Sequence, residues 1–175
     1  MGQENPRLTE SLKRNYAFID GQNLHMNTAK KRRNPWKIDL VRFRLYLKKR
    51  HNVSKAYYFF GYPQESNEEI YKEIERTGFI LVFRAHNSGM LGLKKGNVDA
   101  DIIFHVLWKL YKRENFHKVV LVSGDGDFKL LVDALIEENK FEKILFPSST
   151  NRSSLYKSLT NKYCTSLDKI QKRVP

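Results

Sequence analysis

The hydrophobic residues of this chain gather in short runs that are apolar at consecutive positions instead of alternating with polar ones. Consecutive apolar positions are typical of strands that are buried on both faces of a parallel sheet. Each run ends at a Gly, a Pro or a polar turn, which limits its length. The pattern predicts five strands, at residues 16–20, 56–62, 79–83, 119–122 and 143–147.

The segments between these runs have the spacing of amphipathic helices. Ile38, Val41 and Leu45 recur at helical intervals, as do apolar residues after position 98. Helices are predicted at residues 37–50, 66–77, 98–114, 128–139 and 152–161, with loops at 27–34 and 84–97. Strands that alternate with helices predict a single-domain α/β, Rossmann-like fold, with a central parallel sheet of about five strands and helices on both faces. We expect a flexible arm at 1–14, the domain at 15–170 and a basic tail at 171–175.

The length and the cysteine content narrow the class of protein. A chain of 175 residues suits one domain that can bury a core without disulfides. Its single cysteine, Cys164, excludes an internal disulfide and favours a reducing, intracellular (cytoplasmic) location. No run approaches the ~18 apolar residues of a membrane span, and the first residues lack the apolar segment of a secretory signal. We therefore expect no membrane partner.

The charge adds the first indication of a partner. The chain carries 32 Lys and Arg against 19 Asp and Glu, a formal net charge of +13. Such an excess is typical of proteins that bind nucleic acid, although a well-solvated basic surface is the plainer alternative. The loop at 27–34 concentrates this charge and is a candidate for gripping an RNA backbone, through Lys30, Lys31, Arg32 and Arg33.

The aspartates are distributed unevenly. Five of the eight lie in three short motifs that follow predicted strands or open a helix: Asp20, Asp99 with Asp101, and Asp125 with Asp127. The carboxyl ends of parallel strands share one edge, so Asp20 and Asp125 converge if their strands are neighbours. Carboxylates gathered in this way repel one another unless a cation lies among them, and hard oxygen ligands favour Mg²⁺ or Mn²⁺. A cation held beside a basic surface suits the hydrolysis of phosphodiesters.

Each motif also has a plainer interpretation. The Asp20–Gly21 pair is a common turn, and the SGDGDF segment could be a turn in which Asp127 caps the following helix. Asp99 and Asp101 are about 200° apart on a helix, so only one of them can face the site, and Asp99 is the better candidate. A phosphatase of the haloacid dehalogenase kind needs two acids after the first strand, where DGQN supplies one.

Three segments together resemble the NYN family, whose LabA-like members have a PIN-like nuclease fold: FIDGQNL at 18–24, KKGNVDADI at 94–102 and VSGDGDF at 122–128. The resemblance covers about residues 15–170. It implies a Mg²⁺- or Mn²⁺-dependent ribonuclease that acts on single-stranded or structured RNA. By this resemblance, Asp20, Asp99, Asp125 and Asp127 contact metal, and Asn23 supports the metal or the substrate. It further implies that Ser123, Lys94 and Lys95 lie beside the substrate. Because PIN-like folds often dimerise, the resemblance also makes a homodimer a possible assembly.

The chain departs from the family pattern at one point. Many members carry another acid further along the helix that follows the KGxxD segment, and this chain has IIFHVLW there, with His105. That difference makes Asp101 a candidate substitute ligand. Two hypotheses remain open: a metal-dependent endoribonuclease, and a module of the same fold that binds RNA or a partner with weak or no catalysis.

Overall fold

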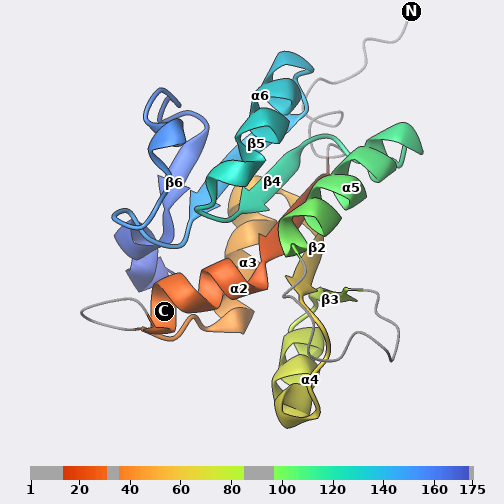
Figure 1. Ribbon diagram of the computed structural model, residues 1–175, viewed down its shortest axis with the longest axis vertical. Helices are drawn as coiled ribbons and strands as arrows, with labels where there is room; N and C mark the ends of the chain where they lie inside the picture. The colour runs from red at the N-terminus through yellow and green to blue at the C-terminus, as the bar shows by residue number, and fades with distance from the viewer. Residues whose placement is uncertain (1–13, 31–35, 85–96, 174–175) are drawn as a thin grey trace, which may run out of the picture.

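The computed structural model describes residues 14–30, 36–84 and 97–173 (Figure 1). Within these residues a single six-stranded sheet has the order β3-β2-β1-β4-β5-β6, and every pair of neighbours is parallel. The strands are β1 (Asn15–Asp20), β2 (Val53–Phe60), β3 (Ile80–Phe83), β4 (Val119–Val122), β5 (Phe141–Phe146) and β6 (Cys164–Ser166). The predicted α/β class with a central parallel sheet is confirmed.

Strand β1 lies at the middle of the sheet, where the strand order reverses direction. All six of its residues are buried, and it pairs with β2 on one side and β4 on the other. In the register, Ile19 lies opposite both Tyr58 and Val122, so β1 and β4 end at almost the same level. The predicted neighbourhood of the first and fourth strands is therefore correct. Parallel sheets bind ligands outside the carboxyl ends of their strands at such a reversal point.

Helices cover both faces of the sheet. They are α2 (Gly21–His25), α3 (Leu40–His51), α4 (Glu68–Arg76), α5 (Val98–Tyr111) and α6 (Lys129–Glu137). Alternate strand residues point to opposite layers. Phe18 packs in one core with residues of α5 and α6, whereas Ile19 packs in the other with residues of α3 and α4. The carboxyl edge of the sheet lies between the starts of α2 and α5, as Figure 1 shows.

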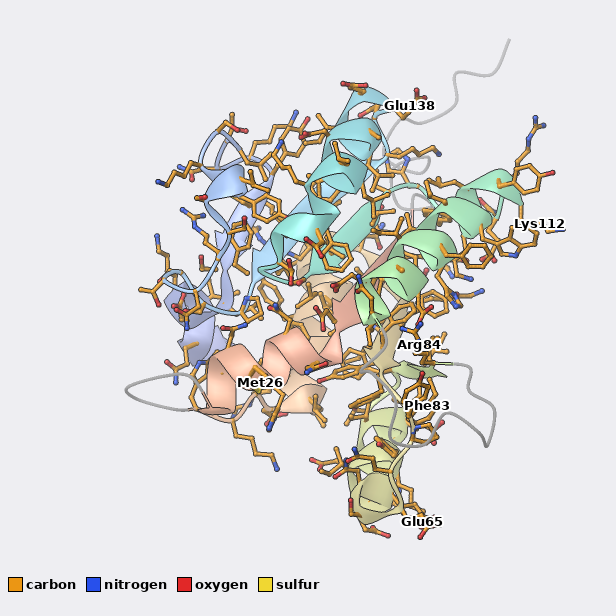
Figure 2. All side chains as sticks on the ribbon, viewed as in Figure 1. Met26, Glu65, Phe83, Arg84, Lys112 and Glu138 are labelled. Carbon is orange, nitrogen blue, oxygen red and sulfur yellow. The ribbon has the colours of Figure 1, made fainter. Side chains whose placement is uncertain are left out.

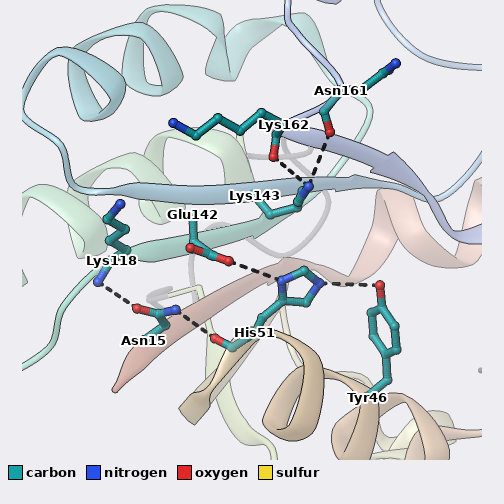
Figure 3. Close-up of polar contacts among 8 residues, drawn as sticks. All are labelled: Asn15, Tyr46, His51, Lys118, Glu142, Lys143, Asn161 and Lys162. Carbon is teal, nitrogen blue, oxygen red and sulfur yellow. Dashed lines mark hydrogen bonds and ion pairs between the residues drawn. The ribbon is translucent and has the colours of Figure 1, made fainter. Parts of the chain in front are cut away.

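A polar network ties the opposite, amino-terminal edge together (Figure 3). The buried Asn15 side chain donates from Nδ2 to the carbonyl of His51 at 2.7 Å, and its Oδ1 accepts from the amide of Lys118 at 2.9 Å. His51 Nδ1 in turn lies 3.6 Å from Glu142 Oε1 on β5. One asparagine at the start of β1 thus joins the end of α3 to the segment that enters β4.

Two predicted features of the carboxyl-terminal part are wrong. The sheet has a sixth strand, β6, whose three residues are too short to produce a hydrophobic pattern. The helix predicted at 152–161 is absent: the described chain there forms only the 3₁₀ turn Ser154–Tyr156. The Ser153 amide donates to the carbonyl of Gly124, and the Ser153 hydroxyl accepts from the Leu155 amide. The first bond is a tertiary contact and the second a local one, and both take the place of helical hydrogen bonds.

The other predicted elements differ from the observed ones mainly at their ends. Helix α3 begins at Leu40 because the Asp39 side chain caps it, and the chain at Met26–Lys30 continues α2 as a π-helical turn where a loop was predicted. The predicted arm at 1–14 lies almost wholly outside the described residues, as do residues 85–96 of the second loop and 174–175 of the tail. Among the described helices, none has the length and apolar character needed to cross a bilayer.

Candidate functional site

Two buried polar side chains meet where β1 and β4 end. Asp20 is the last residue of β1, and Ser123 follows the last residue of β4. The Ser123 hydroxyl donates to Asp20 Oδ2 at 3.1 Å and accepts from the Asp125 amide at the same distance. The serine predicted beside the substrate therefore orients the Asp20 carboxylate and holds the following turn against it.

The Asp20 carboxylate is buried, with 4% of the residue exposed. Its Oδ1 accepts from the Asn23 amide at 2.9 Å, which caps α2. Burial raises the pKa of Asp20 above its usual range; the hydrogen bonds from Asn23 and Ser123 oppose this shift, and the charge of Asp125 adds to it. The carboxylate is thus fixed in place by the protein while its negative charge is poorly solvated.

A second carboxylate approaches from another element. Asp99 lies in the first turn of α5, where its amide donates to the side chain of the N-cap residue Asn97 at 2.9 Å. Burial, together with the charges of Asp20, Asp125 and Asp127, raises the pKa of Asp99 to about 7. The carboxylates of Asp20, of Asp125 and Asp127, and of Asp99 come from three separate segments and lie close enough to act on one another electrostatically.

The structure places Asp101 differently. Its Oδ2 lies 3.8 Å from the guanidinium Nη1 of Arg84, which follows β3. The charges that raise the pKa of Asp99 are those of Asp20, Asp125 and Asp127. The twist of the helix separates the two residues as expected, and Asp101 forms an ion pair next to the group of four aspartates instead of joining it.

Asn23 holds the site together through its side-chain carbonyl. Its Oδ1 accepts from the Gly124 amide at 3.0 Å and from Asn27 Nδ2 at 3.1 Å. The contacts that the structure gives this residue fasten α2 to the turn after β4. Asn27 was missed in the sequence, where only its position four residues after Asn23, one helical turn further on, pointed to it.

Asp125 and Asp127 occupy the turn after β4. Asp125 Oδ1 accepts from the Asp127 backbone amide at 3.1 Å, so Asp125 caps the 3₁₀ turn Gly126–Phe128. The expectation that Asp127 caps the following helix is wrong, because α6 begins after Phe128 without a side-chain cap. The Tyr156 hydroxyl donates to the Asp125 carbonyl at 2.6 Å. Tyr156 was not among the candidates, because no local pattern connects it to a turn 31 positions earlier.

A polar depression of about 300 Å³ lies between the end of β1, the turn after β4 and the start of α5. Its lining includes Asp20, Gln22, Asn23, Asn97, Asp99 and Asp125. The donors are hard oxygen atoms, so the donor set suits Mg²⁺ or Mn²⁺ in kind. Burial is the main cause of the raised pKa of Asp99, and the charges of the neighbouring aspartates add to it. Among the described residues, however, no three His, Cys, Asp or Glu side chains form a group that could hold a metal ion.

Most of the basic residues predicted to contact RNA lie outside the described part of the chain. Lys31, Arg32, Arg33, Lys94 and Lys95 lie outside the described residues, and for Lys30 the backbone alone is described. The segments on either side of them, at Met26 and Asn97, line the depression. Their role remains a prediction from the sequence.

The chain is similar to a known protein in sequence and to a solved structure in fold. The low amplitude and bright protein LabA of Synechococcus elongatus is 25% identical over 127 residues, which cover 67% of this chain. This chain spans 65% of the length of that relative. A solved protein of unknown function from Vibrio parahaemolyticus superimposes with a TM-score of 0.73 at 19% identity, over 91% of this chain and 95% of its own. The second likeness shows a shared fold.

The NYN domain model matches residues 15–167, which include the whole sheet and the three acidic motifs. The match begins at the first residue of β1 and ends one residue after β6. The chain belongs to the NYN domain family, a PIN-like nuclease family.

Proposed function

We propose that this protein is a metal-dependent ribonuclease that cleaves RNA internally at the carboxyl edge of the sheet. The observation that carries the proposal is the convergence of Asp20, Asp99 and Asp125, from three separate segments, on one depression at the β1–β4 reversal point. Membership of the NYN family supports the same chemistry. The net charge of +13 supports a polyanionic substrate.

The chain's own groups have distinct tasks in this proposal. Asp20, Asp99 and Asp125 would hold Mg²⁺ or Mn²⁺, with Asp127 and Asn23 in support. As described, these carboxylates do not form a three-ligand group, so the ion would have to draw them together. When bound, such an ion lowers the pKa of a coordinated water and neutralises charge on the phosphate. Ser123 orients Asp20 through its 3.1 Å hydrogen bond, and Asn23 keeps the Gly124 turn at a fixed distance from α2.

Cleavage of a mixed-sequence single-stranded RNA tests the proposal. We expect cutting with Mn²⁺ or Mg²⁺ and none with EDTA. Asp20→Asn, Asp99→Asn and Asp125→Asn should each reduce the rate at least about 100-fold, because each removes a charged ligand. Circular dichroism and melting temperature establish that each variant is folded.

Asp101→Asn is the matched control, because it removes a carboxylate from the same helix that is paired with Arg84. It should keep cleavage within a few-fold of wild type. If Asp101→Asn abolishes cleavage and Asp99→Asn does not, the assignment of the ligands is wrong.

The second candidate is a module that binds RNA or a partner without cutting. The absence of an acid in the IIFHVLW stretch favours it. RNA that is retarded on a gel but uncut in every lane, with metal and in all variants, would support this candidate and refute the nuclease. A cytoplasmic location and a homodimer stay predictions, the first from the single cysteine and the second from the family.

A further inference from the structure

A second cavity, of about 420 Å³, lies beside the carboxylate depression. Its wall is built from the ends of β2 and β3, the start of α2 and one side of α4. The residues that give it its character are Gln22, Phe60, Gln64, Ile70, Tyr71 and Arg84. Among the described residues that line it, none is a proposed metal ligand, so the proposed cleavage chemistry leaves it without a role.

The cavity and the depression adjoin each other. Gln22 and Val98 line both of them, and each lies close to a proposed ligand: Gln22 is two residues after Asp20, and Val98 precedes Asp99. A group in the cavity and a group in the depression would therefore share Gln22 and Val98 as neighbours. In a nucleotide, the base and the phosphate likewise share one ribose.

The cavity has a stacked aromatic wall. Tyr58 and Phe60 stack with their ring centres 5.0 Å apart, and Tyr71 of α4 meets the edge of Phe60 at 5.1 Å. Ile70 adds an apolar side chain that is 50% exposed. Aromatic rings and small apolar groups of this kind form the stacking platforms on which proteins bind unpaired bases.

Polar groups complete the cavity around the aromatic wall. Side-chain amides of Gln22, Gln64 and Asn67 line the cavity. Asn67 Nδ2 donates to Gln64 Oε1 at 3.0 Å, which leaves the Gln64 Nε2 donor and the Asn67 Oδ1 acceptor for the edge of a base. Arg84 supplies a guanidinium that its ion pair with Asp101 holds between β3 and α5; Figure 2 shows its side chain beside Phe83 at the end of β3. An aromatic wall with amides and one fixed cation matches a nucleobase better than it matches an aliphatic ligand.

We propose that this cavity binds one base of an unpaired RNA strand, the base of the nucleotide whose phosphate lies at the carboxylates. The inference rests on the proposed ribonuclease function and adds its substrate class, a single strand with an unstacked base. A base paired within a duplex has its edge and both faces occupied and cannot enter such a cavity.

A third depression extends the path on the other side. It has a volume of about 570 Å³ and shares Asn23, Asn27 and Asp125 with the carboxylate depression. Asn151 and Ser153 form its far side. Three contiguous hollows thus run along the carboxyl edge of the sheet, with the carboxylates in the middle one, and a single strand can follow them.

The first experiment measures binding without cleavage. Amide spectra of the ¹⁵N-labelled full chain are recorded in EDTA during titration with AMP, with UMP and with ribose 5-phosphate, which lacks a base. We expect the nucleotides to shift the amides of Gly61 and Gln64, and ribose 5-phosphate to leave them unchanged. Equal shifts from all three probes, or shifts confined to other elements, would overturn the proposal.

Ile70→Trp fills the cavity from an exposed position, so folding should survive. It should weaken AMP binding about tenfold, because the indole takes up the space beside Phe60 and Tyr71 in which the base would stack. Leu130→Trp is the matched control, because Leu130 is 83% exposed on α6 and lies outside the cavity. If both variants bind AMP as wild type does, the cavity is not the base site.

The second experiment separates this proposal from the ribonuclease itself. A 12-nucleotide RNA carries a single abasic site at each position in turn. Wild type should cut poorly where the abasic site flanks the scissile phosphate, and Ile70→Trp should lose that discrimination. Cleavage that ignores every abasic site refutes the base pocket and leaves the nuclease standing. Nucleotide binding at Gly61 and Gln64 with no cleavage of any RNA supports the base pocket and refutes the nuclease.

Discussion

Gly21 shows how one residue can serve both the fold and the site. It follows Asp20 at the start of α2, and a Cβ there would lie 2.6 Å from the carbonyl oxygen of Phe59 and against the ring of Tyr58. The glycine is required because the backbone of α2 approaches β2 too closely for a side chain. This close approach brings the Asn23 amide to the Asp20 carboxylate.

We expect Gly21→Ala to lower the free energy of unfolding by about 1–3 kcal/mol, the usual cost of overpacking. Urea denaturation followed by circular dichroism measures the change. Gly61→Ala is the matched control, since no atom lies within 4 Å of its added Cβ, and it should be neutral. A neutral Gly21→Ala would mean that α2 can shift away from β2.

Sequence motifs located the acidic residues of the site but not the hydrogen bonds that hold them. Asp20, Asp99 and Asp125 stood out because each lies in a short polar motif after or before an apolar run. The bonds from Ser123 to Asp20 and from Gly124 to Asn23 join positions 103 and 101 residues apart. Contacts across such separations leave no periodic signal in the chain.

Among the elements, α3 and β5 are joined by a partly buried polar contact. His51 ends α3, Glu142 lies near the start of β5, and His51 Nδ1 is 3.6 Å from Glu142 Oε1 (Figure 3). The interaction with His51 lowers the pKa of Glu142, burial opposes that shift, and the charges of Lys118 and Lys143 add to it. A lowered pKa means that the folded state favours the ionised carboxylate.

The Glu142 carboxylate should therefore stabilise the fold above about pH 4.5, its ordinary pKa, and lose that contribution as the pH falls through the lower folded value. Glu142→Gln should lower the free energy of unfolding at pH 6 by up to about 1 kcal/mol, since the pair is partly exposed. Urea titrations between pH 3 and pH 6 should show the difference shrinking toward zero.

Glu138→Gln, at the exposed end of α6, is the matched control and should leave the stability near that of wild type at every pH. A loss for Glu142→Gln that is equally large at pH 3 would assign the effect to packing and not to charge.

Predicting the elements succeeded where burial is strong and failed where it is weak. The strand at Val119–Val122 was predicted to the residue, because four consecutive buried apolar side chains have no other stable arrangement here. The segment at 152–161 had helical spacing but is held by bonds to the turn after β4, such as that from the Ser153 amide to Gly124. Tertiary hydrogen bonds outweighed a weak local preference.

On the scale of the whole molecule, two basic groups of the sequence can be compared. The last turn of α3 carries Lys48, Lys49 and Arg50 beside the amino end of β2, far in the fold from the carboxylates. Lys31, Arg32 and Arg33 follow in sequence soon after Met26 and Asn27, which line the site. If RNA crosses the carboxyl edge, the second group should contribute to binding and the first should not.

RNA affinity measured by fluorescence anisotropy at several salt concentrations tests this difference. Replacing Lys31, Arg32 and Arg33 with Ala should reduce the slope of log affinity against log salt by up to about 2, that is about 0.7 for each phosphate contact. The matched triple variant at Lys48, Lys49 and Arg50 removes the same charge. An equal loss of slope in both triples would indicate binding through net charge alone.

The chain's own pattern determined the class of fold and the edge at which its acids lie. Consecutive apolar runs can be satisfied only between two helical layers, and parallel strands bring all their carboxyl ends to one side. Tertiary structure decided which carboxylates share a field, since it sent Asp101 to Arg84 and gathered Asp99 with Asp20. It alone formed the aromatic cavity, because Tyr58 and Phe60 lie on β2 and Tyr71 lies on α4, and only packing of α4 against the sheet brings Tyr71 to their rings.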